Sequence, residues 1–340
     1  MDLEKIQEGL IDKQGRRKYF RELDPKLLDK PPEINVTSIK KKKRILFIVP
    51  NFHWIDEDVN ALWDLFPWNL CQIASVVEDI SEDVKIIDSY KENLSVEELK
   101  KQVAEYKPDI VQLTNSMFVG LAREIKNALG VPVLCALQGE DIFLDDLVEP
   151  YRIQAMEILR KRSLDIDGFI APCQYYASMM AGYLNVTREK ISVVPLGINL
   201  SGHGVHQQNI GDEPFVVGYL ARICPEKGLH ILVDAFYQLT QQLGVDKIKL
   251  SVAGYLGGRD RSYFGEIERQ INVWGLSASF EHWGEVNREQ KIRFLNSVHI
   301  LSVPTIYQES KGLFVLEALA NGIPVVQPRH GSFPEFIEAT

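Results

Sequence analysis

Short, unbroken apolar runs recur along this chain, and segments with helical spacing separate them. The first three runs are ILFIVP (45–50), VKIID (84–88) and DIVQL (109–113). Runs of this length, rich in β-branched residues, are typical of parallel strands that are buried on both faces. Between the second and third runs, Ser95 and Glu98 form the capping-box pattern of a helix over 95–106. Strands that alternate with helices predict a doubly wound α/β fold.

The alternation runs twice along the chain and therefore predicts two Rossmann-like domains. It first ends with ISVVPLG (191–197), passes through a polar segment, and restarts with FVVGYLA (215–221). Two such domains place the carboxyl ends of their strands around a shared cleft. Because the chain stops soon after its last apolar run (323–328), we expect the second domain to be incomplete. The predicted regions are a charged N-terminal extension (1–39), a first Rossmann-like domain (40–200), a linker (201–213) and a second Rossmann-like domain (214–340).

Composition excludes several classes of function. The chain has 340 residues, 45% of them hydrophobic, which suffices for two ordinary cores. A net charge of −9 disfavours nucleic acid as a partner. The cysteines form no CxxC pair and no cluster with histidine, so we expect no metal site and three buried thiols in a reducing cytosol. The cysteines are Cys71, Cys135, Cys173 and Cys224.

The chain has no run of 18 apolar residues and no secretory signal at its start, which predicts a cytoplasmic protein without a transmembrane segment. A basic run from Lys40 to Arg44 precedes the first predicted strand. Its charges either face solvent or attract phosphates and lipid headgroups. Peripheral contact with a membrane therefore stays open.

The segment TIYQESKGLFVLEALANGIPVVQP (305–328) carries the most specific pattern. Its loop contains Glu309 and Gly312, and its predicted helix begins at Leu313 and ends at the Asn-Gly pair. Glycine lets the backbone approach a ligand closely, and the first N–H groups of a helix bind anions. A pyrophosphate at this helix would leave Glu309 within reach of a sugar, while Glu317 would accept hydrogen bonds from ribose hydroxyls.

A second loop lies in GYLARICPEKGLHILVDAF (218–236), between a predicted strand and a predicted helix. Arg222 and Lys227 in this loop are suited to neutralise a diphosphate. Gly254 follows the next predicted strand, and we expect its loop to line the base and ribose.

Together the two segments resemble retaining GT-B glycosyltransferases, family 4 especially. Glu309 and Glu317 match the E-x7-E motif, and Arg222 and Lys227 match the G-x-x-x-R-x-x-x-x-K-G pattern; the resemblance covers about residues 115–340. It implies an enzyme that transfers a sugar, with retention and without metal or cofactor, from a UDP-, GDP- or ADP-sugar. The acceptor is left open among glycans, lipids and small molecules. The resemblance gives Glu309 a catalytic role and assigns donor binding to Arg222, Lys227, Gly254, Gly312, Leu313 and Glu317.

Gln138 occupies a position where related enzymes often carry histidine, in the segment LQGEDIFLDDL (137–147). We assign it to the catalytic site, although glutamine donates hydrogen bonds and does not carry protons. Four carboxylates follow and either position an acceptor hydroxyl or face solvent. They are Glu140, Asp141, Asp145 and Asp146.

Residues 43–114 instead resemble the cobalamin-binding Rossmann-like domain that precedes many radical S-adenosylmethionine enzymes. Neither a D-x-H-x-x-G motif nor a CxxxCxxC cluster is present, and His53 stands alone. The glycine-free stretch 51–70 contains Trp54, Trp63 and Trp68, which either stack on a ring or pack in a helix interface. Three alternatives remain. They are a transferase with a fused or divergent first half, a nucleotide-sugar-binding protein without turnover, and a cobalamin-binding module.

Overall fold

The computed structural model describes residues 43–49, 81–88, 92–204 and 214–338. These residues form two compact units that divide the chain between Pro195 and Leu196. Several predictions lie outside the described residues. They are the extension 1–39, most of the basic run, the stretch 51–70 with His53 and its three tryptophans, Cys71, and residues 205–213 of the linker.

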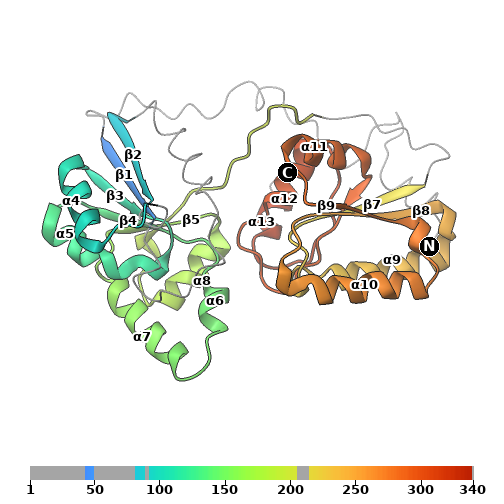
Figure 1. Ribbon diagram of the computed structural model, residues 1–340, viewed down its shortest axis with the longest axis horizontal. Helices are drawn as coiled ribbons and strands as arrows, with labels where there is room; N and C mark the ends of the chain where they lie inside the picture. The colour runs from blue at the N-terminus through green and yellow to red at the C-terminus, as the bar shows by residue number, and fades with distance from the viewer. Residues whose placement is uncertain (1–42, 50–80, 89–91, 205–213, 339–340) are drawn as a thin grey trace. The chain divides into compact units, whose positions relative to one another are not determined.

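The first unit contains a six-stranded parallel sheet in the order β2-β1-β3-β4-β5-β6 (Figure 1). The first five strands follow the flavodoxin-like order of doubly wound folds. Fully buried side chains such as Phe47, Leu113 and Phe169 form its core. The strands are β1 (Arg44–Val49), β2 (Asp83–Asp88), β3 (Ile110–Leu113), β4 (Val133–Ala136), β5 (Gly168–Ala171) and β6 (Ile191–Val193).

Helices connect these strands, as the alternating sequence pattern predicts. The Ser95–Glu98 capping box is confirmed at the start of the first described helix. The short helix α6 was not predicted. The helical elements are α4 (Val96–Tyr106), the 3-10 helix η3 (Ser116–Leu121), α5 (Ala122–Leu129), α6 (Asp141–Asp145), α7 (Tyr151–Ser163), α8 (Gln174–Leu184) and the 3-10 helix η4 (Arg188–Lys190).

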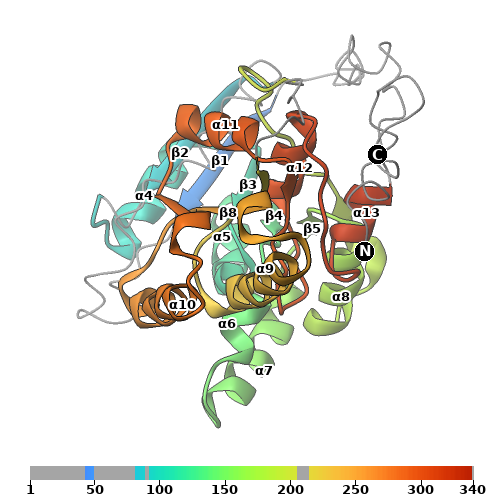
Figure 2. The same ribbon diagram turned by 90° about the vertical axis from the view of Figure 1, so that its right-hand side faces the viewer.

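The second unit contains a four-stranded parallel sheet in the order β10-β7-β8-β9. Helices α9 and α10 run along one face of this sheet and α11 and α12 along the other, as Figures 1 and 2 show. The strands are β7 (Phe215–Leu220), β8 (Ile248–Ala253), β9 (Phe280–Gly284) and β10 (Ile300–Leu301). The helices are α9 (Leu229–Leu243), α10 (Arg261–Val273), α11 (Arg288–Ser297), α12 (Leu313–Ala320) and α13 (Phe333–Glu338), with 3-10 turns η5 (Pro225–Lys227), η6 (Val245–Lys247), η7 (Gly258–Asp260) and η8 (Ser277–Ser279).

Two strands predicted near the end of the chain are shorter than expected. The apolar run HILSVP (299–304) predicts a strand but forms only the two residues of β10, and the predicted strand 323–328 pairs only through the bridge between Leu301 and Val325. Prolines explain this difference, because Pro304, Pro324 and Pro328 have no N–H to donate to a neighbouring strand.

In each sheet the strand order reverses at one place, and open α/β sheets bind ligands there, beyond the carboxyl ends of the strands. The reversal lies between β1 and β3 in the first unit and between β7 and β10 in the second. In the second unit, the loops after β7 and β10 carry Arg222, Lys227 and Glu309, which the sequence singles out.

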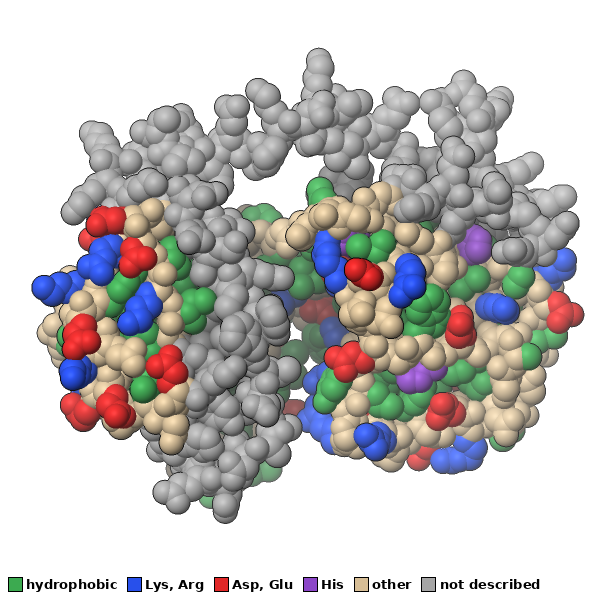
Figure 3. Space-filling view, turned by 45° about the horizontal axis from the view of Figure 1, so that its top comes forward, with side chains coloured by type: hydrophobic (Ala, Val, Ile, Leu, Met, Phe, Trp, Pro, Cys, Tyr) green, Lys and Arg blue, Asp and Glu red, His purple; other side chains and the backbone are tan. Residues whose placement is uncertain are grey.

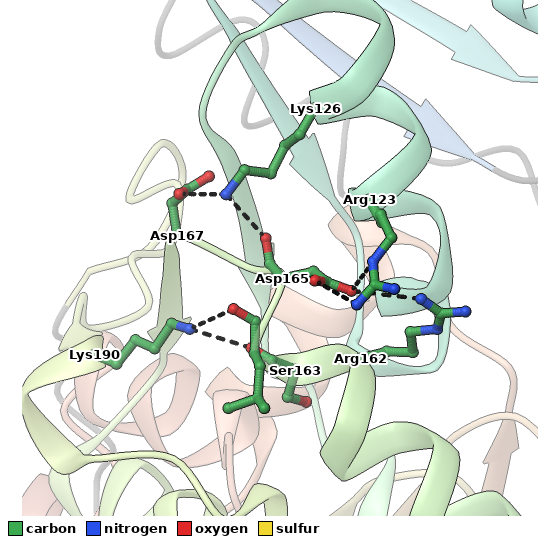
Figure 4. Close-up of polar contacts among 8 residues, drawn as sticks. Arg123, Lys126, Arg162, Ser163, Asp165, Asp167 and Lys190 are labelled. Carbon is green, nitrogen blue, oxygen red and sulfur yellow. Dashed lines mark hydrogen bonds and ion pairs between the residues drawn. The ribbon is translucent and has the colours of Figure 1, made fainter.

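A cluster of basic residues at the opposite edge of the first sheet is engaged in structural contacts (Figure 4). Arg123 bonds both carboxylate oxygens of Asp165, at 3.1 and 3.0 Å, and Lys126 bonds Asp167 at 2.7 Å. These aspartates precede β5, so they lie at the amino end of the strand, away from the predicted ligand edge. The cluster connects α5 to the segment before β5, and the sequence predicts no ligand there.

No helix among the described residues is long and apolar enough to cross a membrane. On the face of the second unit visible in Figure 3, acidic and basic side chains are interspersed. An anion bound on this face would therefore have to be held by a local arrangement of charges.

Candidate functional site

The loop after β7 and the loop after β10 lie against each other at the reversal point of the second sheet. Ile306 N–H donates to the Glu226 carbonyl at 2.9 Å. Gly228 has a φ of +71°, and a Cβ at this position would lie 1.9 Å from the Pro304 carbonyl oxygen. Glycine is thus required here because another backbone occupies the space of a side chain. The contact brings the predicted cation loop beside the predicted glutamate loop.

Lys227 and Glu309 form a buried ion pair across this loop contact. Lys227 Nζ lies 2.5 Å from Glu309 Oε2, which also accepts a hydrogen bond from the Tyr307 hydroxyl at 2.9 Å. The other carboxylate oxygen accepts from the Lys311 N–H at 3.1 Å. Burial alone would raise the pKa of Glu309, but the Lys227 charge and these hydrogen bonds outweigh it and lower the pKa.

Aromatic rings surround the Lys227 ammonium. It lies 5.0 Å from the centre of the Tyr307 ring and 5.4 Å from that of Phe314. Burial and the neighbouring Glu309 carboxylate raise the pKa of Tyr307, which keeps its hydroxyl protonated as a donor. The Lys227 ammonium is therefore held in one position by Glu309 and the two rings.

The amino end of α12 opens beside this ion pair and has no side-chain cap. Gly312 precedes this helix with a φ of +55°, a backbone conformation that favours glycine. Leu313, the first helical residue, is exposed, and so is Arg222 in the loop after β7. A helix amino end, an ammonium and a guanidinium on neighbouring loops provide the features of an anion site.

Sequence reasoning missed one residue that shapes this site. Gly331 has a φ of +60°, and a Cβ there would lie 2.5 Å from the Glu309 carbonyl oxygen and 2.6 Å from its nitrogen. The following Ser332 N–H donates to the Glu309 carbonyl at 2.7 Å. The segment after the last apolar run thus packs on the backbone of Glu309. The Gly-Ser pair at 331–332 was the available signal in the sequence.

Glu317 lies in α12 and Gly254 follows β8, both in the second unit. The Glu317 carboxylate pairs with Lys291 of α11. Gly254 follows β8 with a φ of +149°, and a Cβ there would lie 1.8 Å from the Ala221 carbonyl oxygen. Gly254 is therefore required by the packing of the β8 loop on the β7 loop.

In the first unit, a buried carboxylate organises the loops after β3 and β4. Glu140 is 3% exposed; its Oε1 accepts from the Ser116 N–H at 2.8 Å and its Oε2 from the Gln138 N–H at 2.5 Å. The Gln138 side chain donates from Nε2 to the Thr114 carbonyl at 2.8 Å. Gln138 is therefore anchored through both its backbone and its side chain.

The carboxylates after Gln138 have different environments. Glu140 has a structural role through its two backbone hydrogen bonds, and Asp146 is exposed. Asp145 accepts a hydrogen bond from Tyr183 at 2.9 Å. Asp141 accepts from the buried Tyr176 hydroxyl at 2.5 Å, and burial raises the pKa of Asp141. Asp141 is thus a half-buried carboxylate at the ligand edge of the first sheet.

The sequence also makes predictions about the cysteines and about metal binding. Cys135, Cys173 and Cys224 are buried free thiols, as predicted. Within the described part of the chain, no three His, Cys, Asp or Glu side chains are grouped to hold a metal ion.

Two family models match consecutive parts of the chain. The model "Glycosyltransferase Family 4" matches residues 87–201, and "Glycosyl transferases group 1" matches residues 205–340. The first match includes residues 87–114, which favours a transferase interpretation for that part of the segment resembling a cobalamin-binding domain.

Curated relatives carry transferase names. The chain is 27% identical over 319 residues to the alpha-monoglucosyldiacylglycerol synthase of Streptococcus pneumoniae, covering 87% of this chain and 66% of that protein. It is 27% identical over 223 residues to a D-inositol 3-phosphate glycosyltransferase of Segniliparus rotundus, covering 62% of this chain and 48% of that protein. The chain thus spans less than two thirds of the length of these relatives.

Solved structures share the fold at low sequence identity. Anabaena Alr3699/HepE in complex with UDP and glucose superposes with a TM-score of 0.62 at 17% identity, covering 86% of this chain and 82% of that one. Sucrose-phosphate synthase of Thermosynechococcus elongatus superposes with a TM-score of 0.64 at 16% identity, with the same coverage. Both chains have the two-domain α/β architecture described above.

Proposed function

Because this chain carries the two domains of a GT-B glycosyltransferase, family 4 in its first half and group 1 in its second, we propose that it transfers a sugar from a nucleoside-diphosphate sugar to a hydroxyl acceptor. The observation that carries this proposal is the buried Lys227–Glu309 pair beside the uncapped amino end of α12. A cation and a carboxylate held side by side match a ligand in which a diphosphate adjoins a sugar.

In this proposal the diphosphate binds between the β7 loop and α12. Arg222 and Lys227 neutralise it, and the first N–H groups of α12, starting at Leu313, donate hydrogen bonds to it. Glu309 then accepts hydrogen bonds from the sugar hydroxyls. Glu317, which lies four residues after Leu313 in α12, binds the ribose. The HepE complex contains UDP, which supports a ligand of this class.

The same groups supply the main chemical contribution that we propose. Negative charge develops on the diphosphate as the bond to the sugar breaks, and preorganised cations and N–H groups stabilise it. A metal ion is not needed for this step in our proposal. We propose that the anomeric configuration is retained, because the chain resembles family 4.

The acceptor side of the reaction is assigned to the first unit. Gln138 stands at its ligand edge and is held by Glu140 and Thr114. Asp141 is a hydrogen-bond acceptor for an incoming hydroxyl, and the raised pKa favours its taking a share of the proton. The leaving diphosphate is the other candidate proton acceptor.

A nucleotide-sugar-binding protein without turnover is the second candidate. It is favoured by Gln138, since this amide cannot shuttle a proton and its Nε2 already bonds the Thr114 carbonyl.

One experiment separates the two. Purified protein is incubated with UDP-, GDP- and ADP-sugars, and the released nucleoside diphosphate is measured, with water or added alcohols as acceptor. We expect nucleoside diphosphate to be released from one of the donors. The rate of release should fall more than tenfold in Glu309→Gln. It should be unchanged in Glu268→Gln, which alters an exposed glutamate of α10. If the protein binds a donor but releases no nucleoside diphosphate, it is a nucleotide-sugar-binding protein without turnover. If it neither binds a donor nor releases a nucleoside diphosphate, the proposal is overturned.

A further inference from the structure

The chain that leaves the first unit packs on α11 and on the end of α12, the helix that carries Glu317. We call residues 196–204 the crossover segment. Arg288 of α11 donates from one nitrogen to the carbonyls of Asn199 at 2.9 Å and Ser201 at 2.5 Å. Gly202, with a φ of +79°, packs so closely that a Cβ would lie 3.2 Å from Ile292 Cδ1. The first four residues of the predicted linker are therefore fixed on α11.

A chain of hydrogen bonds continues from this segment to α12. The amide nitrogen Nδ2 of Asn321 lies 2.8 Å from His203 Nδ1 and donates to the Glu317 carbonyl at 2.7 Å. Asn321 is 1% exposed and ends α12. Both contacts use the same NH₂ group, so His203 Nδ1 must accept. The arrangement therefore requires a neutral imidazole with its proton on Nε2.

Glu317 is consequently held from two sides. Its carbonyl is fixed by Asn321, and its carboxylate is directed by Lys291, one turn after Arg288 on α11. The charged groups that face His203 are Arg288 and Lys291 of α11 and Glu317 of α12. Burial and then Arg288 lower the pKa of His203, with Lys291 acting in the same direction and Glu317 opposing them.

We propose that His203 and Asn321 are positioning residues for the nucleotide, and that they hold Glu317 in its ribose-binding place only while His203 is neutral. This inference rests on the proposed function, in which Glu317 binds the ribose. It also gives the crossover segment a part in donor recognition, because its place on α11 and α12 sets the environment of that carboxylate.

The test is titration calorimetry with UDP, GDP and ADP at pH 7.5 and 5.5, on wild type, His203→Ala and His203→Gln. At pH 7.5 we expect His203→Ala to weaken binding about tenfold, because it leaves one buried N–H of Asn321 without its acceptor. His203→Gln offers an amide oxygen to Asn321 and should restore most of the affinity. His282→Gln is the matched control, since burial also lowers the pKa of His282.

Lower pH should weaken wild type more than His203→Gln, because protonation of His203 breaks its contact with Asn321. Any titration of the ligand phosphate affects both proteins equally and cancels in the comparison. Equal pH dependence of wild type and His203→Gln, or wild-type affinity in His203→Ala, would overturn the positioning role alone. Failure of wild type to bind any of the three nucleotides would overturn the proposed function itself. Thermal melting of each variant checks that a weakened variant is still folded.

Discussion

Lys227 Nζ lies 2.5 Å from Glu309 Oε2, although the two residues are 82 positions apart in the chain. The sequence patterns assign the lysine to the diphosphate and the glutamate to the sugar. The structure joins them in one buried ion pair, so the two halves of the proposed donor site are physically coupled. A change in either residue should therefore alter stability as well as ligand binding.

Removing the cation should leave a buried carboxylate without its partner. We expect Lys227→Met to lower the free energy of unfolding by about 3 kcal/mol, the scale for breaking a buried ion pair from one side. Urea denaturation at pH 7 measures this loss. The double variant Lys227→Met with Glu309→Gln should recover part of it, because no uncompensated charge remains. Equal stability of the single and double variants would show that the pair is not coupled.

The lowered pKa of Glu309 makes a prediction about acid stability. A carboxyl group with a lower pKa in the folded state stabilises the fold at pH values above its unfolded pKa. That contribution is lost as pH falls through the folded pKa. Between pH 6 and about pH 3, the unfolding midpoint of wild type should therefore fall more steeply than that of Glu309→Gln. Parallel curves for the two proteins would contradict this pairing.

The contact between the two loops depends on Gly228, which has no room for a side chain. We expect Gly228→Ala to destabilise the protein by about 3 kcal/mol or more, through a positive φ and a clash with the Pro304 carbonyl. Nucleoside diphosphate binding should weaken with it. Gly258→Ala is the control, because nothing lies within 4 Å of the Cβ position there. Chemical denaturation and calorimetry compare the two variants, and similar results for both would disprove the loop contact.

Glu140 should affect transfer without affecting nucleotide binding. In Glu140→Gln one acceptor oxygen becomes an NH₂ group that faces the N–H of Ser116 or Gln138. We expect a loss of about 1–3 kcal/mol in stability and slower sugar transfer, with the affinity for nucleoside diphosphate unchanged. Asp146→Asn, at an exposed neighbouring carboxylate, should leave all three quantities as they are. A change in nucleotide affinity in Glu140→Gln would assign Glu140 to a different role.

Sequence periodicity predicts most helices and strands because they depend on neighbouring residues. The start of α12 after Gly312 and the capping box at Ser95 are examples. The strand predicted over 323–328 was wrong in extent, since its proline residues limit pairing to a single bridge at Val325. Apolar composition alone could not reveal that limit.

The sequence proposes candidate site residues one by one, but it does not show how they are arranged. Motif spacing proposes Arg222, Lys227, Glu309 and Glu317 as donor-site candidates, whereas the ion-pair partners of the last three lie far away in the chain. Lys291 is 26 positions from Glu317, and His203 is 118 from Asn321. Only the fold brings such pairs together, so the ion pairs and the docked crossover segment had no signal in the sequence.

The most direct test of the proposed donor site is titration of wild-type protein with UDP, GDP and ADP in a calorimeter. We predict saturable binding of one nucleoside diphosphate, weakened at least about tenfold in Arg222→Ala. Arg269→Ala removes an exposed arginine of α10 and should bind as wild type does. No detectable binding of any of the three up to about 1 mM, or equal binding by both arginine variants, would contradict the proposed site.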